Sequence, residues 1–238
     1  MSHPDAFYLP DLTPPYVLTG GEAAHCGKVL RKRPGDIVRL FDGRGREGLF
    51  TITAVARDRV ELEAVSLGFE PEAAHRVHLA AGFSRSARRD LFLEKSVELG
   101  AAGLFFWQAE RTQGRMPEAL KDGWTATLIA AAKQCGAARL PALELLPGGA
   151  AGLIAATSGR FDRRFLLWED PDAPRRLAPA DLTAPGDVLC VLGPEGGLTE
   201  GEVDAFTADG FEAVSLGRRV LRWETAGLAV LALALVGS

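Results

Sequence analysis

Five consecutive residues, Gly193-Pro194-Glu195-Gly196-Gly197, form the clearest ligand-binding pattern in the chain. They follow an apolar run from Asp187 to Leu192 that is typical of a buried strand. Glycine allows a ligand to approach the backbone closely, and Pro194 stiffens the turn. A second apolar segment runs into Leu216-Gly217-Arg218-Arg219. Two strands that each end in a tight glycine turn predict a ligand crevice at the carboxyl edge of a parallel sheet.

The glycine spacing differs from the two common nucleotide-binding patterns. Neither G-x-G-x-x-G nor G-x-x-x-x-G-K-[ST] occurs in the chain, which argues against a Rossmann dehydrogenase and against a P-loop protein. Thr199 and Glu202 form a capping-box pattern that predicts a helix beginning at Glu200. The five glycine-turn residues alone are equally typical of a purely structural strand–turn–helix connection.

The elements that must position this crevice alternate between strand and helix patterns from about residue 77 onward, which predicts an α/β fold with a mainly parallel sheet. Strands are expected over Val77–Phe83, Leu104–Trp107 and Phe165–Trp168, and helices over Arg88–Leu99 and Trp124–Cys135. The run from Ala226 to Val236 has no polar side chain, but it is well short of the ~20 residues that span a membrane. We therefore expect a helix that is buried in the core or in a subunit interface.

The N-terminal part, residues 1–70, is rich in strand patterns and predicts a small β-barrel. Strands are expected over Ile37–Phe41, Leu49–Val55 and Val60–Val65, and a short helix between Thr19 and Leu30. The segment Gly68–Arg76 contains Pro71 and precedes a change of hydrophobic period. We place the domain boundary there, which gives domains over residues 1–70 and 76–238.

Composition narrows the protein class further. The chain has 238 residues, 47% hydrophobic residues and a formal charge of −4, which describes a soluble globular protein rather than a charge-driven nucleic-acid binder. The N-terminus lacks a signal-peptide pattern, so we expect a cytoplasmic protein. Cys26, Cys135 and Cys190 are scattered, so we predict neither a zinc site nor a disulfide, and no metal; buried free thiols are the expectation.

Two blocks in order, GPEGGLTEGEV and SLGRRVLRWETA, resemble the C-terminal signature of the SPOUT methyltransferase superfamily. They are most similar to the family that methylates N3 of a uridine in small-subunit ribosomal RNA. Weaker similarities to that family begin at Ser84, Glu94, Glu110 and Gln134. Four residues depart from the family pattern. Lys133 stands in place of Glu, Ala137 in place of Arg, Arg218 in place of Pro, and Trp223 in place of Thr.

The resemblance implies a fold, a cofactor and a partner. The fold would be a SPOUT-type trefoil-knotted, parallel-sheet methyltransferase domain preceded by a small PUA-like β-barrel that helps to hold RNA. The cofactor would be S-adenosylmethionine, and the substrate ribosomal RNA or an assembled small ribosomal subunit. Members of the family work as homodimers, and no membrane association is implied.

Site residues follow from the same resemblance. Arg222 would stabilise the anion that develops as N3 of uracil attacks the methyl group, because a guanidinium stays charged. Glu224 would orient Arg222 or accept the N3 proton through water. Trp223 would stack on a base or, as we favour, fill core volume. The expected cofactor-binding residues are Leu167, Trp168, Glu169, Leu192, Gly193, Pro194, Glu195, Gly196, Gly197, Leu216, Gly217, Val220, Leu221 and Thr225. The expected RNA-binding residues are Lys28, Arg31, Lys32, Arg33, Arg85, Arg88, Arg89, Arg111, Gln134, Arg139 and Arg218.

Two alternatives remain open at this point. One is another SPOUT activity, such as methylation of the ribose 2′-oxygen. The other is an RNA-binding ribosome assembly factor without catalysis, for which Ala137, Arg218 and Trp223 would be signs of decay.

Overall fold

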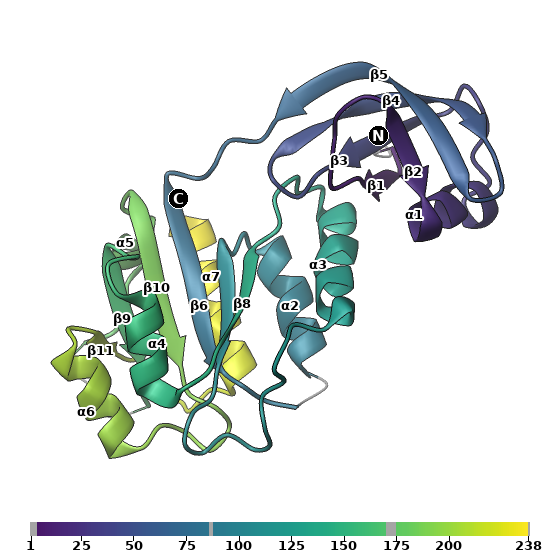
Figure 1. Ribbon diagram of the computed structural model, residues 1–238. Coiled ribbons are helices and arrows are strands. Elements are labelled where there is room, and N and C mark those ends of the chain that lie inside the picture. Colours follow the sequence, from purple (N-terminus) through teal and green to yellow (C-terminus); the bar gives the residue numbers. More distant parts are fainter. Residues whose placement is uncertain (1–3, 86–87, 170–174, 238) are drawn as a thin grey trace. The chain divides into compact units, whose positions relative to one another are not determined.

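The computed structural model describes residues 4–85, 88–169 and 175–237, and the chain divides into two compact units (Figure 1). The first unit contains the described residues up to Glu72 together with Ile129–Leu140. The second contains Ala73–Leu128 and the chain from Pro141 onward. The first unit is thus assembled from two separate stretches of sequence.

The first unit is built on a five-stranded sheet with the order β1-β3-β4-β5-β2. Its strands are β1 (Ala6–Tyr8), β2 (Tyr16–Thr19), β3 (Ile37–Phe41), β4 (Arg46–Val55) and β5 (Arg59–Phe69). One face of the curled sheet buries Phe7, Leu40 and Phe50, as alternation along half-buried strands requires. The predicted short helix is present as α1 (Gly20–Ala24), which continues into a π-helical turn, η1 (His25–Val29).

The stretch Ile129–Leu140 is held to the first unit by directed contacts. The Gly45 amide donates to the carbonyl oxygen of Ala138, 3.1 Å away. Arg139 Nε donates to the carbonyl oxygen of Glu70 at 2.9 Å, and its guanidinium lies 5.1 Å from the centre of the Phe69 ring. The sequence analysis assigned these residues to the C-terminal half of the chain and did not anticipate this packing.

The second unit contains a six-stranded, fully parallel sheet with the order β11-β9-β10-β6-β7-β8. Its strands are β6 (His75–Gly82), β7 (Gly103–Trp107), β8 (Ala142–Leu146), β9 (Arg163–Leu167), β10 (Gly186–Leu192) and β11 (Glu212–Val214). In register, Leu192 lies beside Leu167 on one side and Ala81 on the other. The carboxyl ends of β6, β9 and β10 therefore meet at one edge, as the glycine turns predicted.

Helices cover both faces of this sheet (Figure 1). One layer is formed by α2 (Arg88–Glu98), α5 (Pro179–Thr183) and α7 (Trp223–Gly237). Helix α7 contacts both α2 and α5 and packs against β6 and β10. The other layer contains α4 (Gly149–Thr157) and α6 (Glu200–Ala208). The core between α4, α6 and the sheet includes Trp107, Leu153, Val191 and Phe206, which are fully or almost fully buried. The remaining helix, α3 (Asp122–Cys135), crosses the division between the two units.

Most predicted elements occur, with three differences. Strands β4 and β5 are longer than expected, and β5 continues to Phe69. Five elements were not predicted: the short β1, β2 and α5, strand β8, which is short and interrupted by Glu144, and helix α4, which is a short glycine- and alanine-rich run. Cys26 and Cys190 are buried free thiols, but Cys135 is exposed at the end of α3, so the expectation of three buried thiols was wrong.

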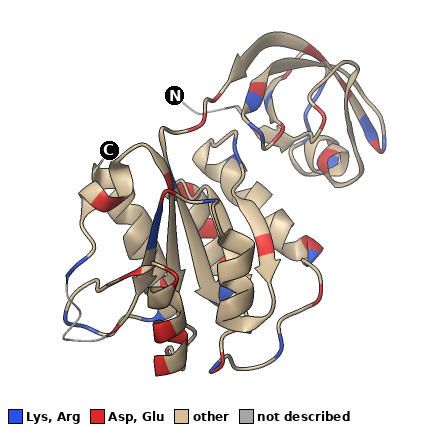
Figure 2. Ribbon diagram, turned by 60° about the vertical axis from the view of Figure 1, so that its left-hand side comes forward, with Lys and Arg blue, Asp and Glu red and all other residues tan. Residues whose placement is uncertain are grey.

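Acidic and basic residues are mixed along the ribbon of each unit (Figure 2). Within the described residues, no helix combines the length and apolar character needed to cross a membrane.

Candidate active site

A cavity of about 380 Å³ lies at the carboxyl ends of the parallel strands in the second unit. This volume is in the range of small-molecule sites. It is lined by Arg88, Leu167, Trp168, Glu169, Leu192, Gly193, Pro194, Glu195, Leu216, Gly217, Arg219, Val220, Leu221, Arg222, Trp223 and Ala226. Three chain segments that follow β9, β10 and β11 thus form one site, with the start of α2 and of α7.

Most of the sequence-predicted cofactor residues line this cavity, from Leu167 on the first loop to Leu221 on the third. Gly196 and Gly197 line an adjoining cavity of about 250 Å³ that shares Trp168, Glu169 and Glu195 with the first. Thr225 is not part of either lining and is exposed.

Two glycines shape the cavity. A Cβ at Gly82, the last residue of β6, would lie 2.5 Å from the Pro194 nitrogen, so only glycine permits this close approach of the turn. Gly217 has a φ of +128°, and no other atom lies within 4 Å of the position of a Cβ. The cavity is therefore open at Gly217, where a ligand can contact the main chain.

The carboxylate of Glu195 ties three segments together. Its Oε1 accepts a hydrogen bond from Ser84 Oγ at 2.6 Å and another from Trp223 Nε1 at 3.2 Å. Trp223 is 5% exposed, and its ring lies 5.0 Å from the ring of Phe92 on α2. Trp223 thus fills core volume, as we favoured from the sequence, and it also holds the glycine turn through its indole N–H.

The two predicted catalytic residues are placed differently. Arg222 is exposed in the cavity wall. Glu224 is 6% exposed and does not line the cavity; its Oε1 lies 3.4 Å from Nε of Arg88, which does. Glu224 Oε2 is buried and accepts no hydrogen bond within the described part of the chain. The structure thus brings Arg88 and Arg222 to one cavity and sets Glu224 behind Arg88.

The predicted RNA-binding residues of the first unit fall into two groups. Lys28, Arg31 and Arg33 are exposed on or just after η1, and Gln134 is exposed on α3. Two others are engaged within the unit. Lys32 forms an ion pair with Asp5 at 2.6 Å, and Arg139 makes the contacts with Glu70 and Phe69 described above.

The predicted RNA-binding residues of the second unit lie at the two adjoining cavities or at a separate cleft. Arg111 lines the smaller cavity and donates to the carbonyl oxygens of Gly196 and Leu198 at 3.4 and 3.3 Å. Arg218 is exposed beside the third loop. Arg85 and Arg89 line a separate cleft. Residues 86 and 87 lie outside the described residues.

Sequence reasoning missed three residues of this site. Arg219 and Ala226 line the cavity, and Ser84 binds Glu195. Arg219 belongs to the second glycine turn and could have been included on that basis. Ser84 is 111 residues from Glu195, and no local pattern indicates their contact.

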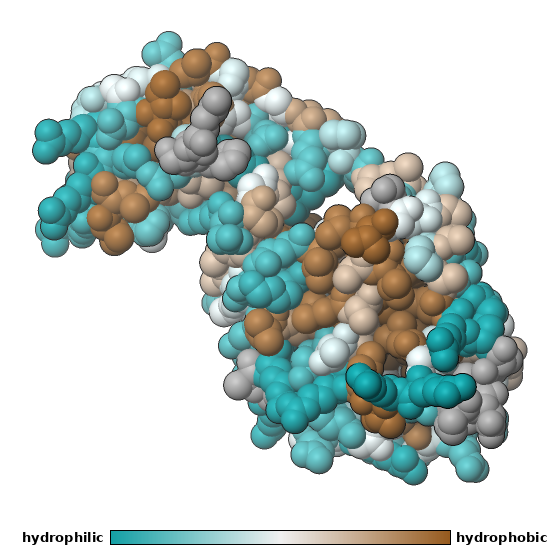
Figure 3. Space-filling view, turned by 180° about the vertical axis from the view of Figure 1, so that it is seen from behind, coloured by the Kyte–Doolittle hydropathy of each residue, from teal (hydrophilic) through white to brown (hydrophobic). Residues whose placement is uncertain are grey.

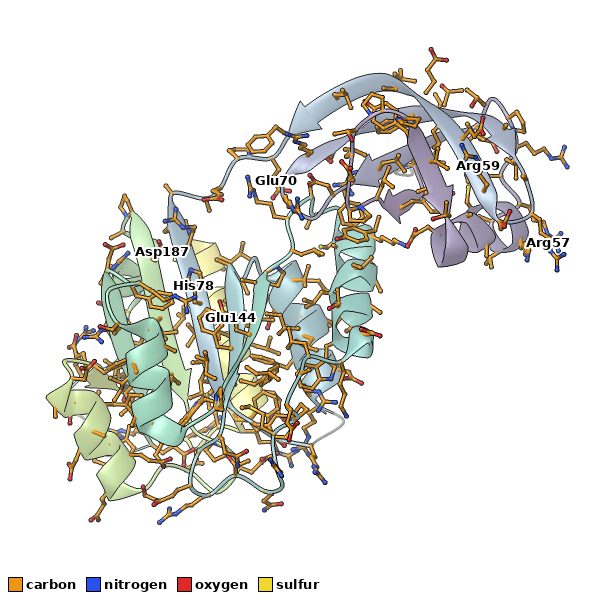
Figure 4. The ribbon with its side chains drawn as sticks, in the orientation of Figure 1. Arg57, Arg59, Glu70, His78, Glu144 and Asp187 are labelled. Carbon is orange, nitrogen blue, oxygen red and sulfur yellow. The ribbon has the colours of Figure 1, made fainter. Side chains whose placement is uncertain are left out.

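A further polar cluster lies toward the amino-terminal ends of the strands, away from the cavity (Figure 4). His78 Nε2 on β6 lies 2.9 Å from Asp187 Oδ1 on β10, and Arg76 forms a two-pronged ion pair with the same carboxylate. Burial lowers the pKa of His78, although Asp187 acts in the opposite direction. The hydrogen bonds from Arg76 hold the pKa of Asp187 below its usual value, and His78 adds a smaller effect in the same direction. This cluster joins two central strands and does not reach the cavity.

Comparison with known proteins decides the family. Residues 71–235 match the model of an RNA methyltransferase domain, and residues 18–65 match that of an RNA methyltransferase PUA domain. The chain belongs to the RNA methyltransferase family. The fold class predicted from the sequence is thereby confirmed: a SPOUT-type α/β methyltransferase with a parallel sheet, preceded by a small PUA-like barrel.

Individual relatives of this RNA methyltransferase cover nearly its whole length. A ribosomal RNA small subunit methyltransferase E from Mycobacterium bovis is 30% identical, over 96% of this chain and 88% of the relative. The crystal structure of a probable rRNA-methyltransferase from Porphyromonas gingivalis is 31% identical, with a TM-score of 0.84, over 98% of this chain and 96% of the other. A ribosomal RNA small subunit methyltransferase E from Neisseria gonorrhoeae, solved with bound S-adenosylmethionine, is 29% identical, with a TM-score of 0.82, over 97% and 96% of the chains.

Proposed function

We propose that this RNA methyltransferase transfers a methyl group from S-adenosylmethionine to N3 of a specific uridine in small-subunit ribosomal RNA. The observation that carries the proposal is that Arg222 lies in the wall of the same cavity as the predicted cofactor-binding residues. The names of the relatives support the RNA substrate, and the solved complex from Neisseria gonorrhoeae supports the cofactor.

The residues of the cavity fit S-adenosylmethionine. Leu192, Val220 and Leu221 supply apolar surface, while the backbone at Gly193 and Gly217 supplies polar groups that can be approached closely. Trp168 and Glu169 would close the side formed by the loop after β9. A methyl donor of this kind carries the reacting carbon on a positively charged sulfur, so the protein must chiefly align the acceptor with it.

Arg222 would act on the acceptor base. N3 of uracil lies between two carbonyl oxygens, which gain negative charge as N3 loses its proton and attacks the methyl group. A fixed guanidinium beside these oxygens stabilises that charge. The exposure of Arg222 in the cavity wall, without an ion pair in the described part of the chain, leaves its donors available for this role.

Glu224 would act through Arg88 in this proposal. A buried carboxylate 3.4 Å from Arg88 Nε keeps that guanidinium at the cavity wall, where it can contact the RNA. A direct role as proton acceptor has less support, because Glu224 does not line the cavity.

RNA would be held by both units. Lys28, Arg31 and Arg33 present exposed cations on the first unit, and Arg218 does so near the cavity, whose wall also contains the half-buried Arg88. Arg57, in the turn between β4 and β5, adds an exposed cation that the sequence analysis did not select (Figure 4). The natural substrate would be ribosomal RNA or an assembled small subunit in the cytoplasm.

We further propose that the protein works as a homodimer through the outer face of α7. Leu235 and Val236 are 52% and 77% exposed, and other apolar residues of this helix are only half-buried. Hydrophobic residues gather over the second unit on the side where α7 lies (Figure 3). Leu235→Lys and Val236→Lys should shift a dimer toward monomer in analytical ultracentrifugation, and an unchanged sedimentation coefficient would contradict this interface.

The principal test uses unmethylated small ribosomal subunits, S-adenosylmethionine and reverse transcription. A methyl group on N3 blocks base pairing, so the polymerase should stop at one uridine only when cofactor and protein are both present. Arg222→Ala should abolish the stop while retaining cofactor binding. Cofactor binding without any stop would sink the N3 assignment, and would leave ribose methylation or an assembly factor without catalysis.

A further inference from the structure

A cleft separate from the cofactor cavity lies between the start of α2 and the loop that precedes α3. Its volume is about 620 Å³, and all its residues belong to the second unit. It is lined by Phe83, Arg85, Arg89, Arg115, Met116, Pro117, Glu118 and Lys121. Four of these residues are cationic and one is acidic. In a chain with a formal charge of −4, this is a local concentration of positive charge.

One wall of the cleft is held rigidly. The guanidinium of Arg89 lies 4.6 Å from the centre of the Trp124 ring, and Trp124 itself is 3% exposed. The side chain of Arg89 is 16% exposed, and its Nε is buried without a hydrogen-bond partner in the described part of the chain. Stacking fixes the plane of the guanidinium before any ligand binds, so less conformational entropy is lost on binding.

The cleft is also lined by highly exposed charges. Arg115 pairs with Glu118 at 3.2 Å, but their side chains are 83% and 86% exposed, and such a pair contributes little. Lys121 is exposed, and no ion pair engages it among the described residues. Arg115 and Lys121 can therefore turn toward an anion in the cleft at small cost.

The base of the cleft is apolar. Phe83 and Met116 are 3% and 8% exposed, and Pro117 lies beside them. An apolar base below a cationic rim suits a nucleotide, whose base and sugar can contact the apolar surface while its phosphate meets the cations. A purely acidic peptide would gain nothing from the apolar base.

The cleft adjoins the cofactor cavity. Arg88 lines the cavity, and the next residue, Arg89, lines the cleft. Both sites therefore include a residue of the first turn of α2. A nucleotide strand that enters the cavity with one base can therefore place a neighbouring nucleotide in the cleft.

We infer that this cleft binds the phosphodiester backbone of a nucleotide that flanks the methylated base, with Arg115 and Lys121 as phosphate contacts opposite Arg89. The inference rests on the proposed function for the identity of the strand. It adds a subsite and two residues to the RNA contacts, and it explains why a loop outside the cofactor cavity carries this charge.

The test compares Arg115→Ala/Lys121→Ala with the wild-type protein on unmethylated small subunits. We expect RNA affinity at low salt to fall about tenfold, and the slope of log affinity against log salt to decrease by ~0.7 for each lost phosphate contact. The KM for RNA should rise while kcat at saturating RNA and the affinity for S-adenosylmethionine stay unchanged. Unchanged cofactor affinity also shows that the variant is folded.

Two single variants sharpen the comparison. Glu118→Gln removes the acidic residue of the cleft. It should strengthen RNA binding two- to threefold, because a carboxylate that repels the RNA phosphates is lost. Lys95→Ala makes the same charge change as Lys121→Ala but lies on α2 outside the cleft lining, where Lys95 pairs with Glu94 and Glu98. It should leave RNA affinity and the salt slope as in the wild type.

Each outcome has a definite meaning. An affinity and a salt slope equal to wild type in the double variant would overturn the cleft assignment, even where the wild type methylates. Uridine monophosphate or inorganic phosphate that binds tightly, with RNA binding unaffected by the variants, would assign the cleft to a small phosphate ligand and also overturn it. A wild type that produces no reverse-transcription stop refutes the proposed function instead, while affinity and salt slope still report on the cleft.

Discussion

The indole Nε1 of Trp223 donates a hydrogen bond to Oε1 of Glu195, 3.2 Å away, so the first residue of α7 is fastened to the glycine turn after β10. Ser84 Oγ donates to the same oxygen. These two donors hold the turn from α7 on one side and from the end of β6 on the other. The glycine turn is therefore positioned by side chains outside it as well as by its own conformation.

Replacing Trp223 by Phe tests this fastening. Phenylalanine keeps an aromatic ring against Phe92 but loses the indole N–H and part of the buried volume, so the effect of the N–H is taken from cofactor binding rather than from stability. Glu195 is exposed, so we expect a cost of ~1 kcal/mol, seen as about fivefold weaker binding of S-adenosylmethionine in calorimetry. In a double-mutant cycle with Ser84→Ala the two losses should not add, because both donors serve one oxygen. Full additivity would show that the two hydrogen bonds act independently.

Arg222→Lys tests whether charge alone suffices at the cavity wall. A lysine keeps the charge but lacks the planar fork of donors, so kcat should fall by ~10- to 100-fold and by more in Arg222→Ala. Arg222 is exposed, so thermal stability should stay within ~0.5 kcal/mol. Arg218→Ala is the matched control: it should raise the KM for RNA and leave kcat nearly intact. Equal kcat in Arg222→Lys and wild type would remove the requirement for the guanidinium.

Gly82→Ala tests the close approach of β6 to the glycine turn. The new methyl group would lie 2.5 Å from the Pro194 nitrogen and 2.8 Å from its Cδ, so the turn must move. We expect a loss of ~1–3 kcal/mol in the free energy of unfolding and weaker cofactor binding, measured by chemical denaturation and calorimetry. Gly201→Ala makes the same change on α6, where a Cβ meets open space, and should be neutral or stabilise by ~0.5–1 kcal/mol. Similar results for the two variants would contradict the steric argument.

His78 should make the protein less stable as the pH falls below about 6.5. The His78 ring packs against Phe105 and Phe161. Asp187, Arg76 and Arg160 are the charged groups near it. Burial is the largest effect and lowers the pKa of His78 below 6.5. Above about pH 6.5 neither the folded nor the unfolded state holds the proton. As the pH falls below that value the unfolded chain binds it first, so the free energy of unfolding falls by at most ~1.4 kcal/mol per pH unit until the folded pKa is reached.

Denaturant titrations between pH 5 and 7 measure this effect. The variant His78→Phe keeps the aromatic packing and leaves Asp187 paired with Arg76, so its stability should depend less on pH in this window.

Asp187 contributes separately at lower pH: its pKa is depressed, so its stabilisation is present above its usual pKa and is lost as the pH falls through the depressed value. Equal pH dependence of the variant and the wild type would show that another group is responsible.

The sequence predicts the parts of the site that are local in the chain. Residues from Gly193 to Gly197 line the two adjoining cavities, and most residues from Leu216 to Arg222 line the larger one, because a strand end and its turn are encoded by consecutive residues. Contacts between distant segments leave no such pattern. Glu195 meets Ser84 across 111 residues, and Glu224 meets Arg88 rather than the neighbouring Arg222. The cationic cleft was likewise not predicted as one site, since Lys121 and Arg89 are 32 positions apart in the chain and line one cleft only in the folded protein, where Arg89 stacks on Trp124 of α3.

The division of α3 between the two units has a consequence for the order of folding. The first unit includes Ile129–Leu140, so its contacts at Gly45, Glu70 and Phe69 are completed only by residues that follow two strands of the parallel sheet, β6 and β7, in the chain. A ribosome translating this protein must have added residue 140 before the first unit can close. A fragment that ends at Glu72 should therefore be less stable and more susceptible to proteolysis than the same residues in the full chain, although it contains every strand of its sheet.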